Sequence, residues 1–209
     1  MKKVIFNDKL GLTDAVLDGK KTMMRSLCKY DRPNENYEIV FPVFEPEEYD
    51  NDGNITSKLD GAFGWRNKEG YFTGWNIPKY KIGEVVAVAQ SYHSFYNDEC
   101  DPRMFPSGAG WLNKMLVKPE LMPHQIQITD VFMQKLQDIS DEDCLKEGIY
   151  EDSGDDTFPP SVFYEFEGNN DDGFNTPREA FAALIDKLSG KGTWEKNPYV
   201  FIYEFKLIK

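Results

Sequence analysis

The C-terminal segment 176–207 constrains the fold of this chain most strongly, because it joins a well-marked helix to a well-marked strand. The helix begins at a capping box, Thr176-Pro177-Arg178-Glu179, with proline at the first helical position, and ends at Gly190. Apolar residues recur at helical spacing between these limits, at Phe181, Leu184, Ile185 and Leu188. The strand covers Tyr199–Leu207 and alternates, with Tyr199, Phe201, Tyr203, Phe205 and Leu207 on one face and Glu204 and Lys206 on the other.

Further short elements precede this segment. A turn at Ile82-Gly83-Glu84 leads into a buried strand at 85–89, and a second strand covers Ile126, Ile128 and 131–133. Ser140 is predicted to cap a short helix that carries acids in its first turn and ends at Gly148. Because strands and helices do not alternate regularly, the sequence predicts an α+β fold rather than a doubly wound sheet.

Two irregular stretches are predicted to be surface insertions on a single domain that spans 1–209. The first, about 30–80, is rich in aromatic residues and is expected to carry one or two hairpins; it contains an acidic run at 45–52 and a turn at Asn51-Asp52-Gly53. The second, about 150–175, is acidic and rich in turns, around one short strand at 162–166.

Composition excludes several classes of function. The net charge of -12 and the pI near 4.7 argue against a broad basic face for duplex DNA. No apolar run approaches the roughly 20 residues of a membrane span, and Cys28, Cys100 and Cys144 are too far apart for a zinc knuckle. His93 and His124 lack metal-ligand spacing. We therefore expect a cytoplasmic protein without metal or cofactor.

Residues 20–29, which follow a short predicted helix, form the local exception to the acidic composition. Thr13 is predicted to cap a short helix, and Gly19 stands where a left-handed C-cap is expected. Between Lys20 and Lys29 the chain holds four basic residues and no acid, namely Lys20, Lys21, Arg25 and Lys29. Such a strip suits an anionic or carbonyl-bearing ligand, although a lysine pair after a helix is often only solvated.

Four segments together resemble the ASCH domain family, in particular its larger phage- and prophage-associated branch. They are GKKTMMR at 19–25, YKIGEVVAV at 80–88, the stretch 128–149 and the stretch 181–207. They cover roughly half of the chain in the order found in the family. The resemblance implies a PUA-like mixed β-barrel flanked by short helices, with 30–80 and 150–175 as its two insertions.

The resemblance also implies a site. In family members that hydrolyse acetylated cytidine nucleosides, the catalytic lysine corresponds to Lys21 and the glutamate to Glu147, whereas the catalytic threonine position is occupied by Met24. The family arginine two positions after that threonine falls on Ser26.

The function predicted first is binding of RNA or a modified nucleoside in a cleft lined by Lys21, Arg25 and Glu147, with Lys20 and Thr22 as further ligand-binding residues. Two alternatives stay open. One is an amidohydrolase that removes an acyl group from a cytidine-type base, and the other is an accessory protein of a mobile element that acts through protein contacts.

Overall fold

The computed structural model describes residues 1–42, 59, 61–96, 108–153, 162–169 and 173–208. The predicted acidic run at 45–52, the turn at Asn51–Gly53 and Cys100 lie outside these described residues.

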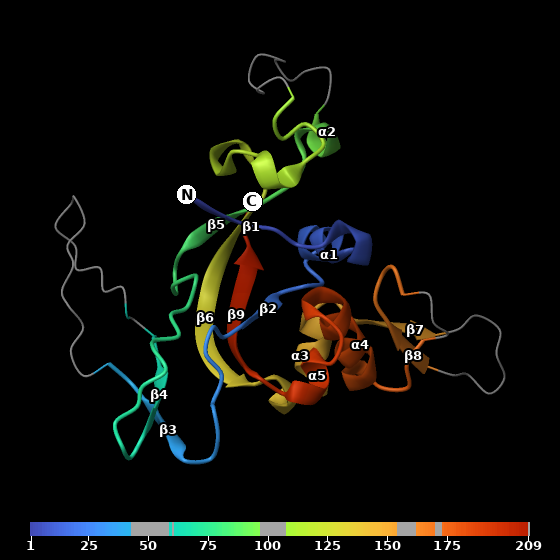
Figure 1. The fold of residues 1–209 in the computed structure, drawn as a ribbon. Coiled ribbons are helices and arrows are strands. Elements are labelled where there is room, and N and C mark those ends of the chain that lie inside the picture. Colours follow the sequence, from blue (N-terminus) through green and yellow to red (C-terminus); the bar gives the residue numbers. More distant parts are fainter. Residues whose placement is uncertain (43–58, 60, 97–107, 154–161, 170–172, 209) are drawn as a thin grey trace.

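The centre of the molecule is a curved five-stranded sheet of mixed direction (Figure 1). Its strand order is β1-β5-β6-β9-β2, and the strands are β1 Lys2–Val4, β5 Val85–Val88, β6 Gln125–Lys135, β9 Tyr199–Leu207 and β2 Met23–Leu27. β1 runs parallel to β5, and the other neighbours are antiparallel. The α+β prediction is therefore confirmed. Among the described residues the sheet stays open, with β1 and β2 at its edges, so no closed barrel is seen.

β6 and β9 form the long central pair of the sheet. Their register shifts between Ile128 and Asp130, and such a bulge increases the bend of a strand pair. The predicted alternation in β9 is present, but Val200 and Ile202 on the opposite face are also fully buried. Both faces of β9 are covered. Helices pack on the face of Val200 and Ile202, and aromatic residues such as Phe63 and Tyr80 pack on the other face.

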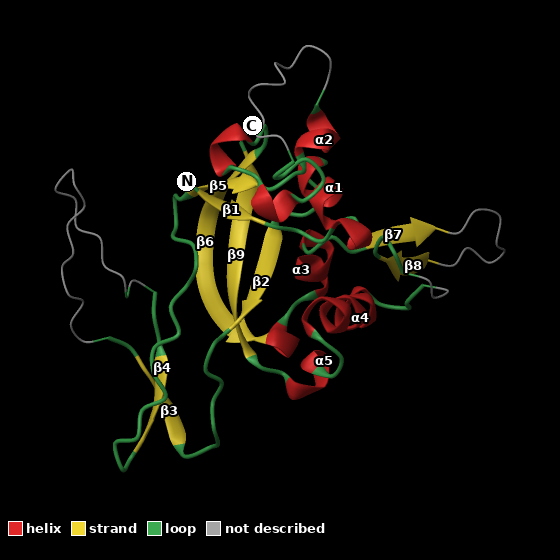
Figure 2. Ribbon diagram, turned by 45° about the horizontal axis from the view of Figure 1, so that its top comes forward, coloured by secondary structure: helices red, strands yellow, loops and turns green. Residues whose placement is uncertain are grey.

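The helices are short except for α4. They are α1 Leu12–Leu17, α2 Tyr92–Phe95, α3 Asp141–Lys146, α4 Pro177–Ser189 and α5 Thr193–Lys196. Figure 2 shows α3, α4 and α5 together on one side of the sheet. The caps of α3 and α4 are as predicted, since the Ser140 hydroxyl accepts from the N–H of Asp143 and the Thr176 hydroxyl from that of Glu179. No described helix has the length and apolar character needed to cross a membrane.

The predicted cap at Thr13 is wrong. A 3-10 turn at Asp8–Leu10 leads directly into α1, so Gly11 is the capping residue, at a φ of 60°. A side chain at Gly11 would collide with Glu167, which explains the glycine. Thr13 lies inside the first turn, where its hydroxyl donates to Oδ1 of Asp8 at 2.6 Å.

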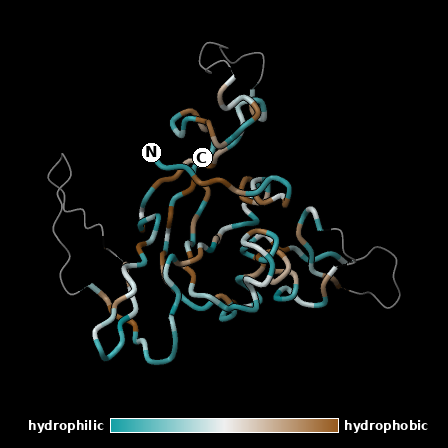
Figure 3. The backbone as a smooth tube through the Cα atoms, viewed as in Figure 1, coloured by the Kyte–Doolittle hydropathy of each residue, from teal (hydrophilic) through white to brown (hydrophobic). Residues whose placement is uncertain are grey.

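Two small hairpins extend from the central sheet. β3 Tyr37–Val40 pairs with β4 Gly64–Asn67 inside the first predicted insertion, and β7 Tyr150–Ser153 pairs with β8 Val162–Glu165 inside the second. Trp65 of β4 is 2% exposed and its ring lies 4.7 Å from that of Tyr199, so the first hairpin is attached to the core. Hydrophobic segments follow the central strands (Figure 3).

Candidate functional site

Lys21 is positioned by the end of α1 and by α3. Gly19 adopts a left-handed conformation, with a φ of 72°, and the N–H groups of Lys20 and Lys21 both donate to the carbonyl of Ala15. The next N–H, that of Thr22, donates to the carbonyl of Lys146 at 2.9 Å. The chain therefore passes the C-terminal end of α3 immediately before β2 begins.

Lys21 and Glu147 form a buried ion pair at this junction. Nζ of Lys21 lies 2.6 Å from Oε2 of Glu147 and also donates to the main-chain carbonyl of Glu147 at 2.7 Å. Both side chains are almost inaccessible, at 3% and 6% exposure. A lysine ammonium has three N–H donors, so one of them is left for a ligand.

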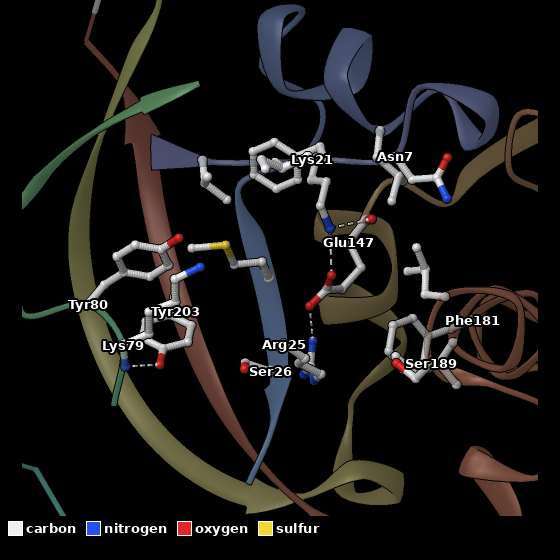
Figure 4. A pocket seen from close by; sticks show the side chains of 17 residues that line it. Asn7, Lys21, Arg25, Ser26, Lys79, Tyr80, Glu147, Phe181, Ser189 and Tyr203 are labelled. Atoms are coloured by element: carbon white, nitrogen blue, oxygen red, sulfur yellow. Dashed lines mark hydrogen bonds and ion pairs between the residues drawn. The ribbon is translucent and has the colours of Figure 1, made fainter. Parts of the chain in front are cut away.

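Arg25 binds the second oxygen of the same carboxylate. Its Nη1 donates to Oε1 of Glu147 at 2.6 Å, and the guanidinium lies 5.5 Å from the ring centre of Phe181. Nη2 lies 3.8 Å from Oδ2 of Asp143, which is an ion pair without a hydrogen bond. Among the described residues, Nε and Nη2 of Arg25 are buried with no hydrogen-bond partner. Glu147 thus bridges two cations (Figure 4).

Burial shifts the pKa values of Lys21 and of the neighbouring Cys144 in opposite directions. The pKa of Lys21 is lowered, because removal of the ammonium from water outweighs the attraction of Glu147, and the charge of Arg25 lowers it further. Burial likewise raises the pKa of the Cys144 thiol in α3 to about 12. An amine with a lowered pKa loses its proton more readily than an ordinary lysine, which is the property a general base requires.

The cluster opens onto a cavity of about 490 Å³. β2 supplies Met24, Arg25 and Ser26, and the segment after β1 supplies Ile5 and Phe6, so the two edges of the open sheet face the same space. The remaining lining residues are Val4, Asn7, Leu12, Lys21, Lys79, Tyr80, Glu147, Phe181, Ile185, Leu188, Ser189 and Tyr203.

The cavity has two dissimilar walls. Figure 4 shows Tyr80 and Tyr203 on one side of β2 and Phe181 on the other. The two tyrosine rings meet edge to face, 5.3 Å apart. The second wall is α4, whose Ile185 and Leu188 also line the space. Lys21, Glu147 and Arg25 lie between these walls in Figure 4, so the cavity combines apolar surfaces with a few fixed polar groups.

Of the residues predicted from the sequence, Lys21, Arg25 and Glu147 are brought together. Met24 and Ser26 also line the cavity, so the positions where the family has a threonine and an arginine belong to the site. Lys20 and Thr22 do not line it: the Lys20 ammonium is exposed and pairs with Asp18 at 3.1 Å, because it follows the turn at Gly19 on the outer side.

Sequence reasoning missed the cavity walls. From the sequence, Phe181 and Tyr203 are predicted only as apolar positions of a helix and a strand, and Tyr80 is only the first residue of a segment that resembles the ASCH family. Spacing cannot reveal them, because they come from distant parts of the chain. Within the part of the chain that the structure describes, no group of three or more His, Cys, Asp or Glu side chains could hold a metal ion.

Comparison of the chain with protein-family models, with curated proteins and with solved structures finds no match.

Proposed function

We propose that the protein binds a modified nucleoside in the cavity between β2 and α4. The observation that carries the proposal is the buried Lys21–Glu147–Arg25 cluster, which lines a cavity together with aromatic residues. The resemblance to the ASCH family, with the PUA-like barrel that it implies, belongs to the same proposal. An open sheet whose two edges face one cavity is compatible with such a barrel.

The size and the walls of the cavity suit one nucleoside. Small-molecule sites usually enclose about 300–1,000 Å³ and combine apolar walls with a few polar groups. The cavity of about 490 Å³ lies within that range. The rings of Tyr80, Tyr203 and Phe181 line this space and offer apolar contact to a base, although each residue is at most 3% exposed in the free protein.

The charges favour a single nucleoside over a long RNA strand. RNA-binding proteins gain much of their affinity by neutralising phosphates with exposed cations. Here the side chains of Lys21 and Arg25 are 3% and 1% exposed and share the carboxylate of Glu147, in a chain of net charge -12. These two cations can contact a group inside the cavity but cannot follow a backbone.

Calorimetric titration of the full chain with cytidine, uridine and N4-acetylcytidine tests the proposal. We expect saturable binding of at least one nucleoside. The affinity should change little between about 50 and 300 mM salt, because a nucleoside carries no net charge for salt to screen. Binding of a hairpin RNA alone, with a steep salt dependence, would instead identify an RNA-binding protein. Binding of neither probe would leave protein contacts as the remaining function.

A second candidate is hydrolysis of an acyl amide on the base. It is favoured by the lowered pKa of Lys21, whose amine lies 2.6 Å from a carboxylate. Met24 weakens it, because a thioether cannot exchange a proton at the position where the family has a threonine.

Acetate release from N4-acetylcytidine measures this activity, and the variant Lys21→Ala should abolish it. Lys20→Ala is the matched control, because Lys20 lies outside the cavity. Release no faster than in a blank rejects this candidate.

A further inference from the structure

We propose that the main chain of Arg25, at the free edge of β2, recognises the ligand by pairing with one edge of a flat heterocycle. The inference rests on the proposed function and names the groups that read the base. β2 is an outer strand of the sheet, and three consecutive residues of it, Met24, Arg25 and Ser26, line the cavity.

The hydrogen-bond pattern of β2 leaves the Arg25 main chain unpaired. Consecutive residues of an antiparallel strand direct their N–H and C=O groups alternately toward the neighbouring strand and away from it. The N–H of Phe205 donates to the carbonyl of Thr22, and the N–H of Cys28 donates to that of Tyr199. The even-numbered residues of β2 therefore pair with β9, whereas Arg25, opposite Ile202, points outward. Across the described residues, no main-chain hydrogen bond from Arg25 to any other element is found.

The exposure of Arg25 shows that these groups reach open space. The residue as a whole is partly exposed, yet its side chain is only 1% exposed. The accessible surface of Arg25 therefore belongs to its main chain. Arg25 also lines the cavity, and we therefore assign this main-chain surface to the cavity side of β2.

The side chains around this edge define a slot for a flat group. Met24 pairs with Tyr203 across the β2–β9 ladder, so both side chains lie on the same face of the sheet, next to Tyr80. The side chain of Arg25 lies on the opposite face, against Phe181. A planar ring that continues the sheet beyond β2 would lie between these two layers (Figure 4).

The chemistry of the edge defines the class of ligand. One residue at a strand edge presents a donor and an acceptor side by side, as each residue of a hydrogen-bonded antiparallel pair does. The complementary group is a ring with an adjacent acceptor and donor, such as the N3/N4 edge of cytosine or the N3/O4 edge of uracil.

The test compares each nucleoside with an analogue that keeps the ring and loses this edge. Cytidine is compared with N4,N4-dimethylcytidine, and uridine with 3-methyluridine, by calorimetric titration of the full chain. We expect each methylated analogue to bind about tenfold or more weakly than its parent, because a buried main-chain group is left unpaired. Equal affinity of parent and analogue would overturn the inference.

Amide hydrogen exchange, followed by NMR, gives a readout at the residue itself. The Arg25 amide should exchange fast in the free protein and at least tenfold more slowly with saturating cytidine or uridine. The Met24 amide, which points toward β9, is the internal control and should be protected in both states. Nucleoside binding without protection of Arg25 would overturn this inference alone. Failure of every nucleoside to bind would overturn both the proposed function and this inference about Arg25.

Discussion

At the scale of single residues, the site depends on how one carboxylate is shared. Glu147 accepts from Lys21 through Oε2 and from Arg25 through Oε1, and the exposure of the three side chains does not exceed 6%. Removing one member of a buried ion pair leaves the other charge uncompensated, which destabilises a protein strongly. The three residues are therefore not equivalent, because only Glu147 balances two charges.

The variant Glu147→Gln should lower the free energy of unfolding by about 3–5 kcal/mol, because two buried cations lose their counterion. Lys21→Met should lower it by only about 1–2 kcal/mol, since Glu147 keeps the hydrogen bond from Arg25. Urea denaturation of both variants measures the difference. A smaller loss for Glu147→Gln than for Lys21→Met would contradict this order.

At the scale of elements, the predictable parts were those with local signals. α4 and β9 were predicted from a capping box and from alternation, and both were confirmed. β1 and β7 were missed, because they have three and four residues and no alternating pattern. The meeting of Lys21 with Glu147 was expected from the family resemblance alone. No local rule links a turn after α1 to the end of α3.

α3 carries Glu147 at its C-terminal end, so its N-cap should matter for the site. Ser140→Ala removes the hydrogen bond to the N–H of Asp143 and should lower the free energy of unfolding by about 1 kcal/mol. Ser153→Ala is the control, because Ser153 is an exposed strand residue without a capping role and should stay within about 0.5 kcal/mol of the parent protein. Equal stability of the two variants would show that the cap does not stabilise α3.

At the scale of the whole molecule, burial of weak acids links the core to pH. Burial raises the pKa of Cys28, Tyr80, Cys144 and Tyr203 to about 12 in each case. These groups stay protonated in the folded protein, whereas the unfolded chain loses the same protons from about pH 9–10. The stabilisation is complete below that range and is lost as the pH rises toward 12.

The free energy of unfolding should therefore fall steeply between about pH 9 and 12. Each such group contributes a slope of about 1.4 kcal/mol per pH unit while only the unfolded chain releases its proton. Cys144→Ala should reduce the slope by up to one such increment, which urea denaturation at a series of pH values can measure. If the free energy of unfolding of Cys144→Ala falls with pH as steeply as that of the parent protein, the assignment of a buried, protonated thiol is contradicted.

The central claim is that the cavity between β2 and α4 is the binding site. A matched pair of variants in β2 tests it most directly: Ser26 lines the cavity and Leu27 does not, yet both residues are exposed neighbours. Each is replaced by tryptophan, and the affinity for the nucleoside that binds best is measured by calorimetric titration. We predict that Ser26→Trp abolishes binding and that Leu27→Trp leaves it unchanged. Equal affinity of the two variants would contradict the location of the site.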